Sequence, residues 1–490
     1  MTLFGHIAYL SVIVLLLTSI PLHQMGEARG ALLVIGAIGI WRHGWAAVNY
    51  SRAAYFLKVA HPRRRRTLEA AFAREPVPPH AFFMVTSYKI DPAVTAPVYQ
   101  SIFRAAAAAP GGATVVASVV ETADNRLIRR LFEQMPPPAR AGVTLIVDQI
   151  PGSGKRDAIA RSLELIRARS PSRRDIIAFV DGDSSVPEDL VARTAPVFCD
   201  PRIGACTTDE AVEIAQPGLF RDWFDLRFAQ RHIMMSSMGL SKRVLTLTGR
   251  MSVFRADLAS DQSFIDMVRA DSIRHWRLGE VRFLTGDDKS TWFWLLKNGY
   301  QMAYLPDVSS VSMESQPRKS FVASAVVLMT RWYGNMLRTN GRSLVLGPKR
   351  IGFFTWWSVL DQRTSIWTTL AGPTGILLTA LLIEPLVLPA YIAWVMGTRY
   401  FYCALLSLVR GRLFPISYPF LLYFGQIVGA LVKSYVLFRL DIQKWTRQSG
   451  SGRLAPANGL SRFRSASSVY LHALTFGWLL VGVMYLTQIV

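Results

Sequence analysis

Cysteine is scarce in this sequence of 490 residues, which contains only Cys199, Cys206 and Cys403. No two of them form a Cys-x-x-Cys pair, and none belongs to a Cys/His cluster. Zinc sites and disulfide frameworks both require more cysteines at closer spacings. The sequence therefore supports neither, and it favours a reducing compartment.

Acidic residues are also in the minority, with 33 Asp and Glu against 55 Lys and Arg and a formal net charge of +22. Such an excess can serve nucleic-acid binding. Here, however, the basic residues cluster beside apolar runs, as in the arginine block at 63–66, which is typical of the cytoplasmic flanks of membrane helices. The charge favours membrane lipid and an anionic substrate or product as partners, and no nucleic acid.

Apolar runs near both ends of the chain enclose a stretch with the composition of a soluble domain. The number of spans before the last basic loop stays open, because three spans would place that loop outside while its charges favour the cytoplasm. The expected order is two N-terminal transmembrane helices (1–50), a basic cytoplasmic linker (51–80), an α/β domain (81–320), interfacial amphipathic helices (321–364), a transmembrane region (365–438), a basic cytoplasmic loop (439–467) and a C-terminal transmembrane helix (468–490).

Within the α/β domain, short apolar runs alternate with helical stretches. This β-α-β-α order predicts a doubly wound, mostly parallel sheet whose ligands bind along the carboxyl ends of the strands. We expect strands at 81–85, 114–119, 143–147 and 176–180, and helices at 98–108, 125–134 and 156–167.

An acidic turn, Asp181-Gly-Asp183, follows the fourth predicted strand. Two carboxylates at the carboxyl end of a buried strand can hold Mg²⁺ or Mn²⁺, and such hard cations bridge to diphosphate oxygens. A solvated turn is the alternative interpretation of this tripeptide.

The segment from Gly152 to Lys155 resembles a phosphate-binding P-loop but fails its pattern. Gln149 stands where the first glycine belongs, and Arg156 replaces the Ser or Thr. A nucleoside-triphosphatase is therefore a poor interpretation. Lys155 and Arg156 begin a helix after a strand, so they can still favour a phosphate at its N-terminus, unless they are ordinary surface charge.

Two further clusters carry chemistry. The adjacent acids Asp287 and Asp288 can supply a general base at a cleft, or they can simply cap a helix. Arg331 can neutralise a leaving diphosphate, and Trp332 can stack on a sugar ring. The alternative for this pair is an interfacial aromatic belt with an arginine that extends toward the headgroups.

These clusters, placed between membrane spans, resemble the family 2 processive membrane glycosyltransferases, and the resemblance covers essentially the whole chain. The segments 285–292, 331–340 and 354–363 are most similar to those of the mannuronan (alginate) synthases of that family. The resemblance implies a GT-A-type α/β domain, cytoplasmic and inserted between transmembrane helices of a multi-pass protein in the bacterial inner membrane.

The resemblance also implies roles for individual residues. It assigns catalysis to Asp288, Asp287, Arg331 and Trp332. It assigns the nucleotide sugar to Tyr88, Asp124, Lys155, Asp181, Asp183 and Arg447, the last in a loop that resembles a gating loop. It assigns the acceptor to Gly249, Arg250, Met251 and Trp332, and the Mg²⁺ or Mn²⁺ ion to Asp183. The sequence departs from the family pattern at Leu328, where Gln-x-x-Arg-Trp has glutamine, and at Glu121 and Asp124, which replace a double aspartate.

The implied function is inverting, processive transfer of mannuronate from GDP-mannuronate into a β-1,4-linked polymer that leaves through the protein's own channel. Implied partners are a cyclic-di-GMP-binding co-polymerase and periplasmic export machinery. Alternatives are a family 2 synthase using a UDP-sugar (cellulose-, curdlan- or hyaluronan-like), a transferase that adds one sugar to a lipid, and a transporter or scaffold.

Overall fold

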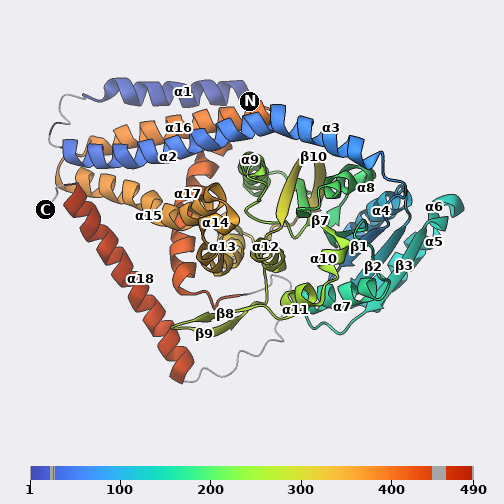
Figure 1. Ribbon diagram of the computed structural model, residues 1–490. Helices are drawn as coiled ribbons and strands as arrows, with labels where there is room; N and C mark the ends of the chain where they lie inside the picture. The colour runs from blue at the N-terminus through green and yellow to red at the C-terminus, as the bar shows by residue number, and fades with distance from the viewer. Residues whose placement is uncertain (1, 22–25, 27, 444–458, 488–490) are drawn as a thin grey trace.

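The computed structural model describes residues 2–21, 26, 28–443 and 459–487. Long helices gather at one end of the molecule and a β-sheet with its own helices at the other (Figure 1). Helices α9 (Leu219–Gly239), α12 (Asp287–Lys297) and α13 (Phe321–Val345) lie between these two parts. The sheet domain and the helical end therefore meet across a helical layer.

The sheet has eight strands in the order β3-β2-β1-β4-β7-β6-β10-β5. Strands β3, β2, β1 and β4 are parallel, β7 runs antiparallel between β4 and β6, and β10 is parallel to β6. The four predicted strands agree with the observed ones to within two residues, and the predicted fold class is confirmed. The strands are β1 (Ala81–Thr86), β2 (Ala113–Val119), β3 (Val143–Gln149), β4 (Ile176–Asp181), β5 (Ser184–Ser185), β6 (Ile203–Glu213), β7 (Met251–Arg255) and β10 (Gln301–Met313).

Both faces of the sheet are covered, which explains the uninterrupted apolar runs of its strands. Side chains alternate between the faces of a strand. On β1, Phe83 and Val85 therefore pack in one core beneath α4 (Pro92–Ala107), while Phe82 and Met84 pack in the other beneath α7 (Lys155–Arg167). Two buried faces are what a parallel α/β sheet requires.

Smaller elements complete the domain. They are α5 (Thr122–Glu133), α6 (Pro137–Ala141), α8 (Leu190–Thr194), α10 (Ala256–Ala259), α11 (Gln262–Arg269), α14 (Gly347–Ile351) and the hairpin of β8 (Ser272–His275) and β9 (Gly279–Arg282).

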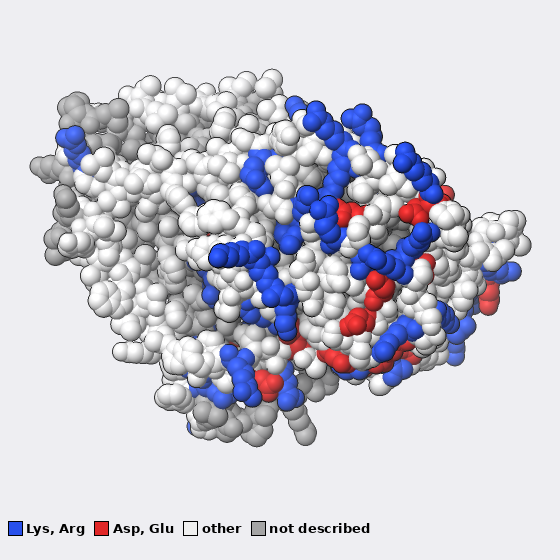
Figure 2. Space-filling view, viewed as in Figure 1, with Lys and Arg blue, Asp and Glu red and all other residues white. Residues whose placement is uncertain are grey.

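Five helices of the described residues are long and apolar enough to cross a membrane. Their exposed surface is rich in large apolar side chains, such as Ile40 and Trp478, and few charged side chains cover the helical end in the view of Figure 2. The chain is therefore a membrane protein. The helices are α2 (Arg29–Tyr55, continued by α3 to Phe72), α15 (Phe353–Leu382), α16 (Val387–Arg410), α17 (Ser417–Phe438) and α18 (Gly459–Leu486); α1 (Thr2–Ser19) is a shorter apolar helix.

Two connections have an unexpected form. Helix α15 runs without a break through 364/365, where the sequence analysis places a domain boundary. Helix α2 continues through one π-helical turn (Phe56–Ala60) into α3 (His61–Phe72). On α3, His61 and Arg65 both pair with Asp307 of the sheet domain, at 3.0 and 3.1 Å. The basic linker is therefore a helix that contacts the domain.

Candidate active site

A pocket opens where the ends of β1 and β4 meet the first turns of α7 and α12. Elements distant in sequence form it, and this is the edge at which α/β sheets bind ligands. Its polar lining includes Thr86, Lys155, Asp181, Thr248, Asp287 and Asp288.

Lys155 joins the two acidic turns. Its Nζ atom lies 2.7 Å from Asp181 Oδ1 and 3.2 Å from Asp287 Oδ2. Burial alone would lower the pKa of Lys155, but the two carboxylates outweigh burial and raise it. The ammonium group is therefore charged at neutral pH and sits at the first residue of α7.

The carboxylates of the pocket differ in proton affinity. Burial raises the pKa of Asp181 to about 7; Lys155 opposes this rise, and the nearby carboxylates of Asp183 and Asp287 add to it. Burial also raises the pKa of Asp288, and the charge of Asp287 raises it further. For Asp287, Lys155 and Arg156 outweigh burial and lower the pKa. Asp288 thus has the stronger proton affinity of the adjacent pair, which suits a general base.

Gly286 sets the direction in which α12 begins. Its backbone is left-handed (φ 82°, ψ 40°), and a Cβ atom placed there would lie 2.9 Å from Asn335 Cγ of α13. Only glycine meets both conditions without strain. This turn puts Asp287 and Asp288 in the first turn of the helix, where its dipole favours negative charge.

Gly286→Ala is expected to lower the free energy of unfolding by about 2 kcal/mol or more, since backbone strain and overpacking add. Thermal unfolding and activity in detergent measure the effect. Gly299→Ala is the matched control, because Gly299 also has a positive φ (80°) but a Cβ atom added there would meet no neighbour within 4 Å. Equal losses in both variants would show that the contact with Asn335 is unimportant.

The segment from Leu247 to Gly249 forms the third side of the pocket. A Cβ atom at Gly249 would lie 3.7 Å from both Asp181 Oδ2 and Lys155 Nζ. Thr246 Oγ1 donates a hydrogen bond to Asp288 Oδ2 (3.4 Å), and Arg250 Nη2 donates to Glu314 Oε1 (2.8 Å). Together these contacts bring the predicted acceptor segment next to Asp181 and Asp288.

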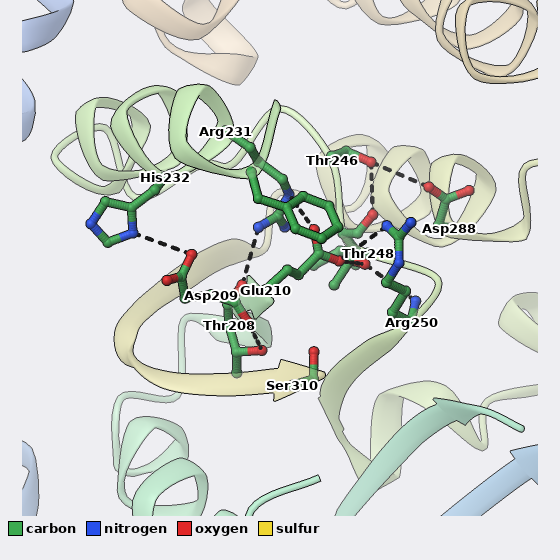
Figure 3. Close-up of polar contacts among 12 residues, drawn as sticks. Thr208, Asp209, Glu210, Arg231, His232, Thr246, Thr248, Arg250, Asp288 and Ser310 are labelled. Atoms are coloured by element: carbon green, nitrogen blue, oxygen red, sulfur yellow. Dashed lines mark hydrogen bonds and ion pairs between the residues drawn. The ribbon is translucent and has the colours of Figure 1, made fainter. Parts of the chain in front are cut away.

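Glu210 anchors this segment through its buried carboxylate. Its buried carboxylate accepts a short hydrogen bond from Thr248 and pairs with Arg231 Nε (3.1 Å) and Arg250 Nη1 (3.6 Å), as Figure 3 shows. No local motif marks Glu210, because all three of its partners are distant in sequence.

Met251 is the third residue of the predicted acceptor segment. It pairs with Val180 in the ladder between β4 and β7, and its side chain is fully buried in the core. The structure therefore places Met251 beneath the pocket and not in its lining.

Arg156 is the second residue whose role the sequence did not reveal. Its buried guanidinium donates to Val268 O (2.9 Å) and to Ser290 Oγ (2.9 Å) on α12. Ser290 also donates to Asp271, which Arg342 of α13 contacts with both terminal nitrogens. Arg156 thus anchors α12, and it does not line the pocket around Lys155.

Tyr88 and Asp124 lie at neighbouring positions on the same edge of the sheet. The Tyr88 ring is 3.7 Å from the place where a Cβ atom of Gly152 would stand. Asp124 is buried in the first turn of α5, where burial and Glu121 raise its pKa. Neither residue lines the pocket around Lys155.

Arg331 and Trp332 are adjacent on α13 but serve different surroundings. The Arg331 guanidinium lies within electrostatic reach of Asp181, Asp183 and Glu314. The Trp332 ring stacks on Trp223 of α9, with centroids 5.7 Å apart. Arg331 therefore faces the acidic turns. Trp332 instead packs on α9, in the helical layer between the sheet domain and the helices that could cross a membrane (the membrane-type helices).

The basic loop predicted at 439–467 is described only at its ends. Gln443 Oε1 accepts a hydrogen bond from Leu284 N (2.9 Å), just before the second acidic turn. Arg447 lies outside the described residues. The described part of the chain contains no group of three His, Cys, Asp or Glu side chains placed to hold a metal ion.

Comparisons with known proteins identify the family. The sequence model described as "Glycosyltransferase like family 2" matches residues 78–335. Glycosyltransferase alg8 of Pseudomonas syringae pv. tomato is 43% identical over 91% of this chain and 90% of its own length. The chain belongs to glycosyltransferase family 2. The predicted enzyme class is thereby confirmed.

Two further proteins are similar to this family member. Glycosyltransferase alg8 of Azotobacter vinelandii is 41% identical over 96% of this chain and 95% of its own length. Among solved structures, the mannosyltransferase PcManGT from Pyrobaculum calidifontis in complex with GDP-Man and Mn²⁺ is 17% identical, with a TM-score of 0.46. That alignment covers 83% of this chain and 98% of the other.

Proposed function

We propose that this family 2 enzyme polymerises mannuronate from GDP-mannuronate into a β-1,4-linked chain, the precursor of alginate. The observation that carries the proposal is the pocket in which Lys155 joins Asp181 to Asp287, with Asp288 beside them. The similarity to the two alg8 glycosyltransferases over at least nine-tenths of each chain supports the choice of product.

The donor diphosphate is assigned to the basic and acidic groups at the ends of β4 and α7. Lys155 and Arg331 supply positive charge for the diphosphate oxygens. Asp181 and Asp183 would hold Mg²⁺ or Mn²⁺, since such ions bind one or two carboxylates plus phosphate oxygens. Burial, with a smaller contribution from the Asp183 and Asp287 carboxylates, raises the pKa of Asp181 to about 7, which fits a site that a cation completes. When bound, the ion neutralises charge on the leaving diphosphate.

Asp288 is assigned the role of general base in a single displacement. Its carboxylate takes the proton from the 4-hydroxyl of the growing chain while that oxygen forms a bond to the donor's anomeric carbon. The bond from this carbon to the diphosphate breaks, and GDP leaves. Attack from the face opposite the leaving group inverts the anomeric configuration.

The proposed setting is the bacterial inner membrane, with the α/β domain in the cytoplasm. The product passes through the helical end of the same molecule, which spares a polar polymer contact with lipid. A cyclic-di-GMP-binding co-polymerase and periplasmic export machinery are the proposed partners. The basic flanks of the helices support this orientation.

A donor panel on purified protein tests the proposal. We expect incorporation from GDP-mannuronate, and a product that a mannuronan-specific lyase degrades. GDP-mannose and the UDP-sugars of cellulose and hyaluronan serve as controls. Incorporation from a UDP-sugar alone, or a product of one added sugar, would overturn the proposal.

A further inference from the structure

We infer that Arg227 of α9 and Lys433 of α17 form a binding subsite for a carboxylate of the growing polymer, at the point where the chain enters the membrane-type helices. This inference rests on the proposed function, because it takes a uronate as the repeating unit.

The two cations converge from different helices on one tyrosine. Lys433 Nζ lies 4.8 Å from the centre of the Tyr333 ring, and the charge of Arg227 also acts on the Tyr333 hydroxyl. A Cβ atom at Gly429 would lie only 3.0 Å from that hydroxyl, so α17 approaches Tyr333 closely there. Lys433 follows Gly429 by about one helical turn and so extends from the same face of α17.

An aromatic pair adjoins the cations. The Arg227 guanidinium lies 4.5 Å from the ring centre of Trp332 and 5.1 Å from that of Trp223. All of these side chains except Trp223 are partly accessible. Flat aromatic surface beside positive charge suits a sugar ring that carries a carboxylate.

In the part of the chain that the structure describes, no carboxylate forms an ion pair with Arg227 or Lys433. Burial alone would raise the pKa of Tyr333, but the two cations outweigh burial and lower it. Unpaired cations among apolar helices are costly, and in membrane proteins they mark the path of a substrate.

The same face of α17 continues the pattern. Gln426 lies seven residues before Lys433, which is two helical turns, and it accepts hydrogen bonds from Arg399 of α16 at 2.8 and 3.0 Å. Helices α16 and α17 contain no Asp or Glu at all. Basic side chains without acidic ones on these two helices favour a polyanion over a neutral glucan as the ligand.

The test compares Arg227→Gln and Lys433→Met with the parent enzyme in detergent. We expect each variant to bind mannuronan oligosaccharides roughly tenfold or more weakly, as for the loss of a hydrogen bond to a charged group. Products should be shorter, while GDP affinity stays unchanged. Lys433→Arg keeps the charge and should restore much of the binding, which a merely structural role would not predict.

Arg221→Gln is the matched control, because Arg221 lies on the same helix, its side chain is 51% exposed, and its ion pair is with Asp225. Unchanged oligosaccharide affinity in both test variants would overturn the inference, and would be the result if the cations bound lipid phosphate. If the parent enzyme makes no polymer from GDP-mannuronate, the proposed function itself fails. The donor panel therefore separates the two failures.

Discussion

Asp288→Asn is expected to lower polymerisation at least about a hundredfold while GDP affinity remains close to that of the parent enzyme. General bases contribute on the order of 10² to 10⁴ in rate, and the amide cannot accept the proton of the sugar hydroxyl. Incorporation of labelled sugar measures the rate, and calorimetry measures GDP binding. Asp189→Asn, at an exposed acid whose side chain is 55% accessible, is the control.

Asp288→Asn is also expected to unfold at a slightly higher temperature than the parent enzyme. Because the pKa of Asp288 is raised in the folded protein, its stabilising contribution is present at low pH and is lost as the pH rises through that pKa. Above that pKa the ionised carboxylate therefore destabilises the fold, and the amide removes this cost. Loss of both stability and GDP affinity in Asp288→Asn would show a structural role instead.

Lys155→Met is expected to weaken GDP binding about tenfold or more and to lower the free energy of unfolding by about 3 kcal/mol. Removal of one partner from a buried ion pair typically costs about 3 to 5 kcal/mol. The lower end applies here, because Asp181, with its pKa near 7, can take up a proton once the ammonium group is gone. Thermal unfolding and GDP titration in detergent provide the measurements.

Two controls make the Lys155 result specific. Because the pKa of Lys155 is raised in the folded protein, the stability that its ion pairs contribute is fully present at pH 7. This stability is lost only as the pH rises through the raised pKa of Lys155. Asp287→Asn added to Lys155→Met should recover part of the lost stability, since one unpaired carboxylate disappears. Lys297→Met, at an exposed position near the end of the same helix as Asp287, should change neither quantity. No recovery in the double variant would contradict the bridging role of Lys155.

The parallel half of the sheet could be predicted because its strands are short apolar runs separated by helical stretches. The position of Asp181 followed from the same pattern, since carboxyl ends of parallel strands share one edge. The antiparallel insertion of β7 could not be predicted, because its place is decided by pairing with β4 and β6, which are distant in sequence.

The candidate site likewise contains residues that the local sequence predicts and residues that it does not. Residues at strand ends and first helical turns, such as Lys155 and Asp288, could be located from local sequence. Glu210 and Arg156 could not, since their roles arise from partners more than twenty residues away. The contact between Trp332 and Trp223 likewise depends on how α13 packs on α9.

Helix α2, the π-helical turn and α3 form one continuous helical segment. This segment fixes how α2, the N-terminal membrane anchor, is rotated about its axis relative to the catalytic domain. Insertion or deletion of one residue in this segment rotates the helix on one side of the change by about 100° relative to the other side. Such a change would carry His61 and Arg65 away from Asp307. Chimaeras that exchange membrane anchors between related enzymes must therefore keep the residue count between Tyr55 and His61.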